Sequence, residues 1–207
     1  MKILTYLSLV LLLSNLSTAS AQSDSSIMKN TYLPNGMLTI EPGIGIKPGP
    51  TSPTPGVMIT NLIQWNLTKR LGIVSHTSYT FNNAFLREFN YITTDYSYSL
   101  SQKFGVGTSL YTKHSSHTFS LMAGIQLDNF KETLNNPEFE KVEISSSVLS
   151  PDFGLMYNLK IGKKKYFFSY RMYLPLYPYP LKCSDINAVD GNISNISLEF
   201  GLGIRLK

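Results

Sequence analysis

The sequence has almost no cysteine: Cys183 is alone among 207 residues, so the chain cannot form an internal disulfide bond. Only 15% of the residues are charged, and the formal net charge of +5 includes no basic run longer than Lys163–Lys165. We therefore expect no nucleic-acid partner. Beyond residue 21, no apolar run approaches the roughly 20 residues of a transmembrane helix, so a membrane crossing would have to use strands.

Motifs for catalysis and cofactor binding are also missing. The sequence contains no glycine-rich phosphate loop, no zinc-ligand spacing and no nucleophile elbow. We therefore expect no cofactor and no metal site.

The first 21 residues have the layout of a secretory signal peptide. Lys2 precedes an apolar run, and the small residues Ala19 and Ala21 offer a cleavage site. A single membrane anchor is the competing interpretation, but the apolar run is short for a span. We predict a cleaved signal peptide at 1–21 for export through the Sec pathway, an N-terminal lead segment at 22–36 and one domain at 37–207.

Apolar and polar residues then alternate with a period of two, which is typical of β-strands. In the segment NISLEFGLGIRLK, 195–207, every second residue is apolar, and the residues between them include Glu199, Gly201 and Gly203. The alternation predicts strands at 38–46, 57–66, 71–81, 91–101, 104–110, 119–127, 153–161, 166–174 and 196–206, with a less regular one at 142–148. Short charged turns are expected at 66–72, 100–105 and 160–166, and long connectors at 47–56, 82–89 and 175–192.

Three β folds fit this alternation. A soluble sandwich and a soluble barrel turn their apolar faces inward, whereas a transmembrane barrel turns them toward lipid. Glycine pairs on the polar faces, such as Gly105 with Gly107 and Gly201 with Gly203, favour the transmembrane barrel because a narrow lumen needs small residues. Tyr and Trp near the ends of the apolar faces fit the aromatic girdles of such a barrel. We predict an all-β, antiparallel up-and-down transmembrane barrel.

In this pattern the chain resembles bacterial outer-membrane β-barrel proteins, over nearly all of the part after the signal peptide. The closing strand is the most specific element, since that family ends with an alternating apolar strand that the barrel assembly machinery reads. Such strands usually end on an aromatic residue, whereas this sequence ends with Leu206 and Lys207. The resemblance implies a small porin-like barrel in the bacterial outer membrane, in contact with its lipid.

The number of strands should be even in a bacterial barrel. The clear strands together with 142–148 make ten, which puts the three short turns on the periplasmic side. The stretch 128–141 is then a long periplasmic connector. With eight strands it becomes an external loop, but the short turns move outside. We favour ten strands, with eight as the alternative.

Charged residues on the polar faces would point into the lumen. They are His76, Asp152 and Lys160, together with a predicted network of Glu41, Asp95, Arg171, Glu199 and Arg205. The expected strand register brings Arg171 near Glu199, and closure of the barrel brings Glu41 towards Arg205. Because buried charges must be paired, we interpret the set as ion pairs that fill the lumen. A narrow polar path or a small-solute site is the functional alternative.

The sequence KHSSH at 113–117 is the candidate for catalysis, at the predicted outer end of a hairpin. A histidine can act as a base to a serine, and His114 with Ser116 resembles the His-x-Ser of lipid A deacylase barrels. No carboxylate is placed as a third member, and histidine and serine also suit a simple polar turn.

Three functions follow as hypotheses. The favoured one is a small, non-enzymatic outer-membrane barrel with a structural role or a minor role in binding a solute or ligand. The second is an outer-membrane hydrolase that modifies lipid A with His114 and Ser116. The third is a soluble secreted β-barrel that binds an apolar ligand. The Tyr- and Pro-rich segment 175–192 fits either a partner contact or a lid over the barrel mouth.

Overall fold

The structure, a computed structural model, describes residues 37–48, 55–85, 88–89, 91–112, 114–135, 138, 140–162, 165–176, 180–182, 190–192 and 196–206. The predicted signal peptide, the lead segment 22–36 and most of the segment 175–192, including Cys183, lie outside the described residues. Within the described ranges, no helix is long and apolar enough to cross a membrane.

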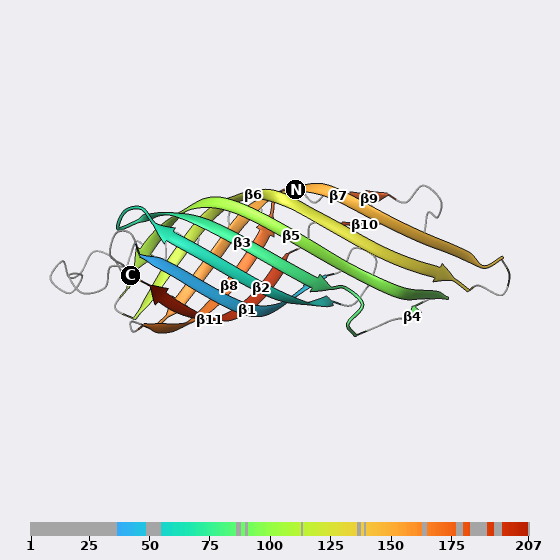
Figure 1. Ribbon diagram of the computed structural model, residues 1–207, viewed down its shortest axis with the longest axis horizontal. Helices are drawn as coiled ribbons and strands as arrows, with labels where there is room; N and C mark the ends of the chain where they lie inside the picture. Colours follow the sequence, from blue (N-terminus) through green and yellow to red (C-terminus); the bar gives the residue numbers. More distant parts are fainter. Residues whose placement is uncertain are drawn as a thin grey trace, which may run out of the picture. The chain divides into compact units, whose positions relative to one another are not determined.

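Eight antiparallel strands form a closed barrel (Figure 1). They are β1 (Leu38–Pro48), β2 (Pro55–Asn66), β3 (Leu71–Phe81), β5 (Ile92–Tyr111), β6 (Ser115–Leu134), β7 (Val142–Ile161), β8 (Tyr166–Pro175) and β11 (Ser197–Leu206). Each pairs with the next along the chain, and β11 pairs with β1 to close the ring. The short β4 (Glu88–Phe89) adds to β5, whereas β9 (Pro180–Lys182) and β10 (Asp190–Asn192) pair with each other.

The prediction of ten strands is wrong, and the alternative of eight is confirmed. The expected turn at 100–105 lies inside β5, where Lys103 pairs in register with Gly124 of β6. The predicted strands 142–148 and 153–161 are likewise one strand, β7, which continues through Pro151. Polar residues in the middle of β5 and a proline in β7 led to the prediction of strand ends there. In the structure both segments remain paired with β6 through these positions.

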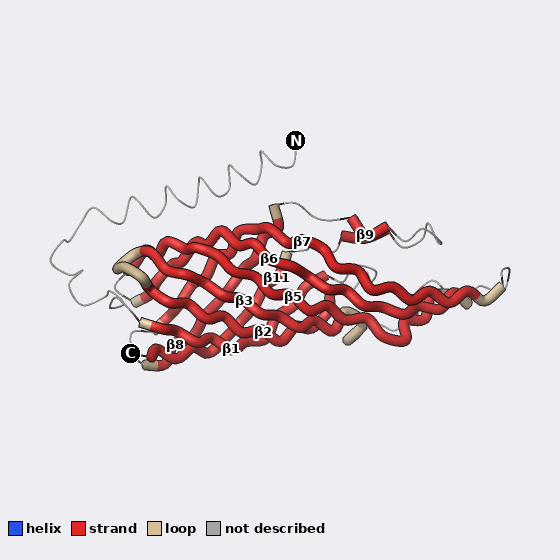
Figure 2. The backbone as a smooth tube through the Cα atoms, turned by 45° about the horizontal axis from the view of Figure 1, so that its top comes forward, coloured by secondary structure: helices blue, strands red, loops and turns tan. Residues whose placement is uncertain are grey.

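At one end of the barrel the strands finish close together, whereas at the other end three of them continue further (Figures 1 and 2). The short connections 67–70, 112–114 and 162–165 lie where β1 begins and β11 ends, and we call this the turn end. At the opposite end, β5, β6 and β7 continue past their neighbours, because β3 pairs with β5 only up to Tyr98 and β8 pairs with β7 only from Gly154. We call the part of these three strands beyond the closed barrel the extension.

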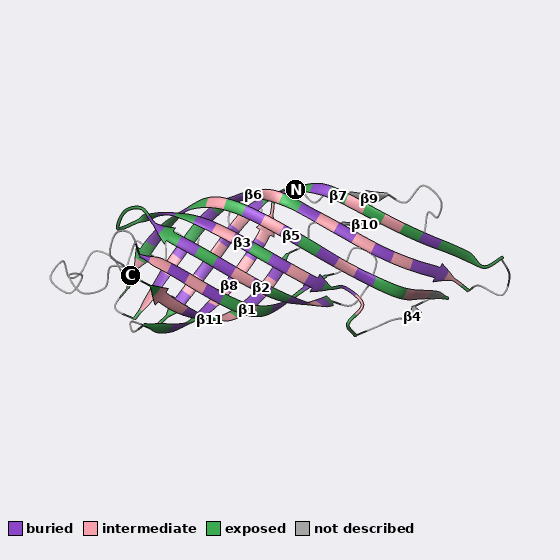
Figure 3. Ribbon diagram, in the orientation of Figure 1, coloured by how far each residue is buried: buried purple, intermediate pink, exposed green. Residues whose placement is uncertain are grey.

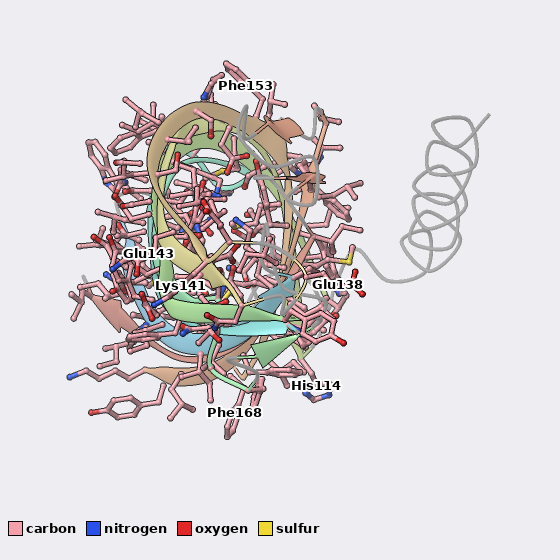
Figure 4. The ribbon with its side chains drawn as sticks, turned by 90° about the vertical axis from the view of Figure 1, so that its right-hand side faces the viewer. His114, Glu138, Lys141, Glu143, Phe153 and Phe168 are labelled. Carbon is pink, nitrogen blue, oxygen red and sulfur yellow. The ribbon has the colours of Figure 1, made fainter. Side chains whose placement is uncertain are left out.

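The burial pattern is inverted relative to a soluble barrel (Figure 3). Along the strands, most apolar side chains face outward, and most of the side chains that face the lumen are polar. Each of the eight strands has an exposed large apolar side chain in its outer face: Ile44, Ile59, Ile73, Phe104, Leu121, Phe153, Phe168 and Phe200. Figure 4, a view along the barrel, shows Phe153 and Phe168 pointing away from it, while other side chains crowd its interior. A face of this kind suits lipid rather than water.

Glycines in the lumen wall make room for the largest inward side chains. A Cβ atom at Gly43 would overlap the guanidinium group of Arg171, and one at Gly203 would overlap the ring of Phe167. The glycines on the polar faces therefore have a steric cause: they lie opposite bulky residues in a narrow lumen.

Candidate functional site in the barrel lumen

Lys160 and Glu41 form an ion pair in the turn-end half of the lumen. The Lys160 Nζ atom lies 2.6 Å from Glu41 Oε1, and both side chains are fully buried. Lys160 also donates hydrogen bonds to Gln64 Oε1 at 2.8 Å and to Thr39 Oγ1 at 3.1 Å. Asn158 Nδ2 donates to the second Glu41 oxygen at 2.9 Å. The charges of strands β1 and β7 thus neutralise each other across the lumen, with their remaining bonds satisfied by neutral groups.

Arg171 lies next along the lumen axis and joins three strands. Its Nε atom is 3.1 Å from Glu199 Oε2 on the neighbouring β11. Its other nitrogens donate to the backbone oxygen of Glu41 and to Thr60 Oγ1, each at 2.8 Å. His76 Nε2 lies 3.2 Å from both carboxylate oxygens of Glu199. A planar guanidinium with several fixed donors suits such a bridging position better than a lysine would.

Two further ion clusters lie nearer the extension. Lys103 Nζ lies 2.9 Å from Asp152 Oδ2 and 4.4 Å from the centroid of the Tyr173 ring, while the Tyr173 hydroxyl donates to Asp152. Lys47 donates to Gln126, whose amide nitrogen donates in turn to Asp128 at 2.9 Å. Each buried cation therefore has a carboxylate within one or two hydrogen bonds, as low-dielectric surroundings require.

The lumen is filled rather than open. Besides the charged groups, an apolar cluster of Leu62, Val74, Met122, Met156 and Tyr173 occupies its middle. Phe167, 3% exposed, lies nearer the turn end beneath Lys160, whose Nζ atom is 5.5 Å from the ring centroid. An eight-stranded barrel is just wide enough for its inward side chains to fill it. The arrangement is suited to stiffening the barrel and offers no continuous path for a solute along these residues.

The structure places some members of the predicted lumen charge network in the lumen and others elsewhere. Glu41, Arg171 and Glu199 are buried in the lumen, and Arg171 contacts Glu199 in the expected register. Asp95 does not lie in the lumen, which corrects the prediction: a register shift between Thr94 and Tyr96 turns it outward in the extension, 3.5 Å from Lys131.

Closure of the barrel brings Arg205 towards Glu41, as predicted, although the two residues do not lie directly opposite each other. Arg205 pairs in register with Thr39 rather than with Glu41, and Glu41 takes Lys160 as its ion-pair partner. The Arg205 guanidinium is stacked 4.5 Å from the centroid of the Phe167 ring and donates to the Gly162 oxygen at 2.7 Å. Arg205 thus closes the lumen at the turn end.

Sequence reasoning missed several members of the network. Lys47, Lys103 and Asp128 were assigned to connectors, yet all three are buried in the lumen. Continuing the alternation of the neighbouring strands through these positions gives the correct inward face, because Lys47 continues the series of Glu41, and Lys103 that of Ser101. The signal was present, but charged residues at strand ends resemble turns.

The candidate catalytic pair is not assembled. His114 lies in the exposed turn and points away from the barrel in Figure 4, whereas Ser116 faces the lumen and is buried. The segment connects β5 to β6 at the turn end, whereas the ten-strand prediction put it at the opposite end of the barrel.

A different serine and histidine meet nearby. Ser115 Oγ lies 3.1 Å from His117 Nε2, and His117 Nδ1 lies 2.8 Å from the Tyr157 hydroxyl. A phenol here holds the position that a carboxylate has in a Ser-His-Asp triad, so it can orient the ring but adds no negative charge to stabilise an imidazolium. Ser115 is also bonded to Thr112 Oγ1 at 2.7 Å. The cluster resembles a polar seam between β6 and β7 more than an activated nucleophile.

Across the described part of the chain, no three His, Cys, Asp or Glu side chains are grouped so as to hold a metal ion.

The fold has solved counterparts, although no protein-family model and no curated protein matches the sequence. The attachment invasion locus protein Ail of Yersinia pestis superposes with a TM-score of 0.54 at 12% identity, over 83% of this chain and 99% of Ail. Ail has also been solved in complex with the heparin analogue sucrose octasulfate. Neisserial surface protein A gives a TM-score of 0.50 at 12% identity, over 84% of this chain and 97% of that protein. Both are eight-stranded outer-membrane β-barrel proteins, so the predicted fold class and the resemblance are confirmed.

Proposed function

We propose, on the basis of the barrel fold that this chain shares with small outer-membrane proteins, that it is a non-enzymatic, closed barrel of the bacterial outer membrane. The signal peptide predicted at 1–21 directs its export, and the turn end faces the periplasm, as short turns do in bacterial barrels. The observation that carries the proposal is the lumen filled by Phe167, Arg171 and the Lys160–Glu41 pair, which supports a structural role over conduction.

Location is tested by fractionation of the native host. We expect the protein in the outer-membrane fraction. Its gel mobility should change on boiling, because a folded barrel resists detergent. A protein recovered in the soluble periplasmic fraction would contradict the proposal and favour the soluble, ligand-binding barrel.

Conduction is tested separately in planar bilayers. The wild-type protein should give no discrete current steps. The double variant Phe167→Ala, Arg171→Ala removes the two bulkiest groups near the turn end and should conduct if it folds, which makes it the positive control. Regular channels in the wild type would overturn the closed-barrel proposal while leaving the membrane location intact.

The part of the molecule available to other molecules is the extension, which stands clear of the membrane in this orientation. Strands of about 10 residues suffice to cross an outer membrane, whereas β5, β6 and β7 have 20 residues each. A minor ligand-binding role would be carried here. Ail binds a sulfated heparin analogue, but in this chain the described lysines of the extension, Lys131 and Lys141, are engaged by carboxylates, so we do not extend that ligand class to it.

A lipid-modifying hydrolase remains a second candidate on one observation, the Ser115–His117 contact of 3.1 Å at a lipid-facing position. Lipid profiles of strains with His117→Ala and His114→Ala test it. Altered lipid only in the His117→Ala strain supports a hydrolase at this new pair, and unchanged lipid in both removes the enzyme hypothesis.

A further inference from the structure

The turn end carries charge of only one sign in its surface segments. The three turns and the residues at the end of β11 contain eight cationic residues and no Asp or Glu: Lys69, Arg70, Lys113, Lys163, Lys164, Lys165, Arg205 and Lys207. Three of these residues, Lys69, Arg70 and Lys165, are described and exposed, and they come from two different turns. We call these three residues the basic collar.

The basic collar borders the apolar outer face directly. Exposed Trp65 and Leu67 precede Lys69 and Arg70 along the chain, and exposed Tyr166 and Phe168 follow Lys165. The Lys165 Nζ atom lies 6.0 Å from the centroid of the Tyr166 ring. Amphipathic Trp and Tyr rings prefer the boundary between hydrocarbon and headgroups. The exposed cations are therefore at the depth of lipid headgroups in any bilayer that covers the apolar face.

The extension shows that this surplus is not a general property of the surface. There, Lys131 lies 3.5 Å from Asp95 and 3.4 Å from Glu143, and Lys141 lies 3.4 Å from the same Glu143. Exposed cations of the extension are thus matched by exposed carboxylates.

We infer that the basic collar binds the phosphate groups of anionic phospholipids in the leaflet that meets the turn end. The inference rests on the proposed membrane location. Cations at an anionic membrane surface are each attracted to it, and the attraction falls off within a Debye length. Only groups placed at headgroup depth benefit, and the apolar outer face fixes that depth for the collar. The bound headgroups would set how the barrel sits along the membrane normal.

Spin-labelled lipids test this in reconstituted bilayers of phosphatidylcholine. Electron spin resonance gives the fraction of labelled lipid immobilised by the protein, for labelled phosphatidylglycerol and for labelled phosphatidylcholine. The collar variant is Lys69→Gln, Arg70→Gln, Lys165→Gln, and the matched control at the other end is Lys131→Gln, Lys141→Gln. Heat-modifiable gel migration verifies that each protein has inserted.

We expect the wild type to prefer phosphatidylglycerol, and we expect the preference to fall by at least about twofold in the collar variant and at high salt, but not in the control. Equal immobilisation of the two lipids by the inserted wild type overturns the inference. A preference that survives both the collar substitutions and high salt also overturns it, as does a preference that the control substitutions remove. Failure of the wild type to insert counts against the proposed membrane location instead.

Discussion

Ion pairs are buried in the lumen of the barrel, whereas in the extension they are exposed to solvent. In the lumen, Arg171 and Glu199 are fully buried and hold each other through contacts with several strands. In the extension, Lys131 and Glu143 also form an ion pair, but each is a third exposed or more. Burial raises the penalty for an unpaired charge, whereas water screens an exposed pair. Similar distances therefore carry different energetic weight in the two regions.

Loss of a lumen charge should have the largest effect. Arg171→Met leaves Glu199 buried without its permanently charged partner, so we expect a loss of about 3–5 kcal/mol in the free energy of unfolding, measured by urea denaturation in lipid vesicles. Lys131→Met in the extension should leave the unfolding midpoint unchanged. Equal effects of the two substitutions would abolish the distinction between the regions.

The double variant Arg171→Met, Glu199→Gln refines that result. If the two groups form one buried unit, the loss in the double variant is smaller than the combined losses of the single variants. Strictly additive losses would show that Arg171 and Glu199 act independently, despite their 3.1 Å contact.

Overfilling the lumen should be the next most damaging change. Gly203→Val introduces a side chain against the Phe167 ring, and we expect about 1–3 kcal/mol of destabilisation from overpacking in the same assay. Ser145→Val introduces the same side chain on the exposed side of β7 in the extension and serves as the control. A tolerated valine at position 203 would mean that the lumen has spare room at the turn end.

The rate of amide hydrogen exchange should differ between the two parts of β7. From Gly154 onward β7 pairs with both β6 and β8, whereas Val142–Phe153 pairs with β6 and has no register pair to β8. We expect amides in the earlier part to exchange faster than those of Leu155–Ile161, in a folded protein studied by mass spectrometry. Uniform protection along β7 would show that another segment stabilises the extension.

The smallest expected effect is a titration in the extension. Hydrogen bonds from Lys141 and Lys131 lower the pKa of Glu143, and contact with Glu143 and Asp95 raises the pKa of Lys131. The interaction is thus present above the ordinary pKa of a glutamate and is lost as the pH falls through the lowered value. Carbon-13 NMR of the Glu143 carboxyl should give a midpoint below that of the Lys131→Met, Lys141→Met variant; coincident midpoints would contradict the pairing.

The fold class could be predicted because lipid and a narrow lumen impose separate demands on alternate residues. In β11, Leu198, Phe200 and Leu202 face outward, while Gly203 lies opposite the bulky Phe167. Both demands are visible as residue types. The strand count was harder to predict, because Ser101, Gln102 and Lys103 form a polar run that is as typical of a turn as of a lumen face.

The site could be predicted only where strand neighbours were certain. Arg171 and Glu199 lie on consecutive large strands, β8 and β11, so their register followed from the hairpin. The pairing of Glu41 with Lys160 joins β1 to β7 across the lumen, and no local rule fixes which inward groups meet across that space. Asp95 was misplaced because one bulge residue reverses the facing of a strand, and alternation alone gives no sign of it.

The seam between β1 and β11 has a consequence for the timing of folding. Its registers join residues near the two limits of the described barrel, such as Leu38 with Leu206, so closure is a contact of very high sequence separation and is expected to be slow. Glu41 lies on β1, and its partners Lys160 and Arg171 lie on late strands. Until the seam forms, these charged groups remain hydrated, which keeps an unfinished chain compatible with water during its passage to the membrane. Closure then removes their hydration and completes the Lys160–Glu41 ion pair, together with the hydrogen bond from Arg171 to the Glu41 backbone oxygen.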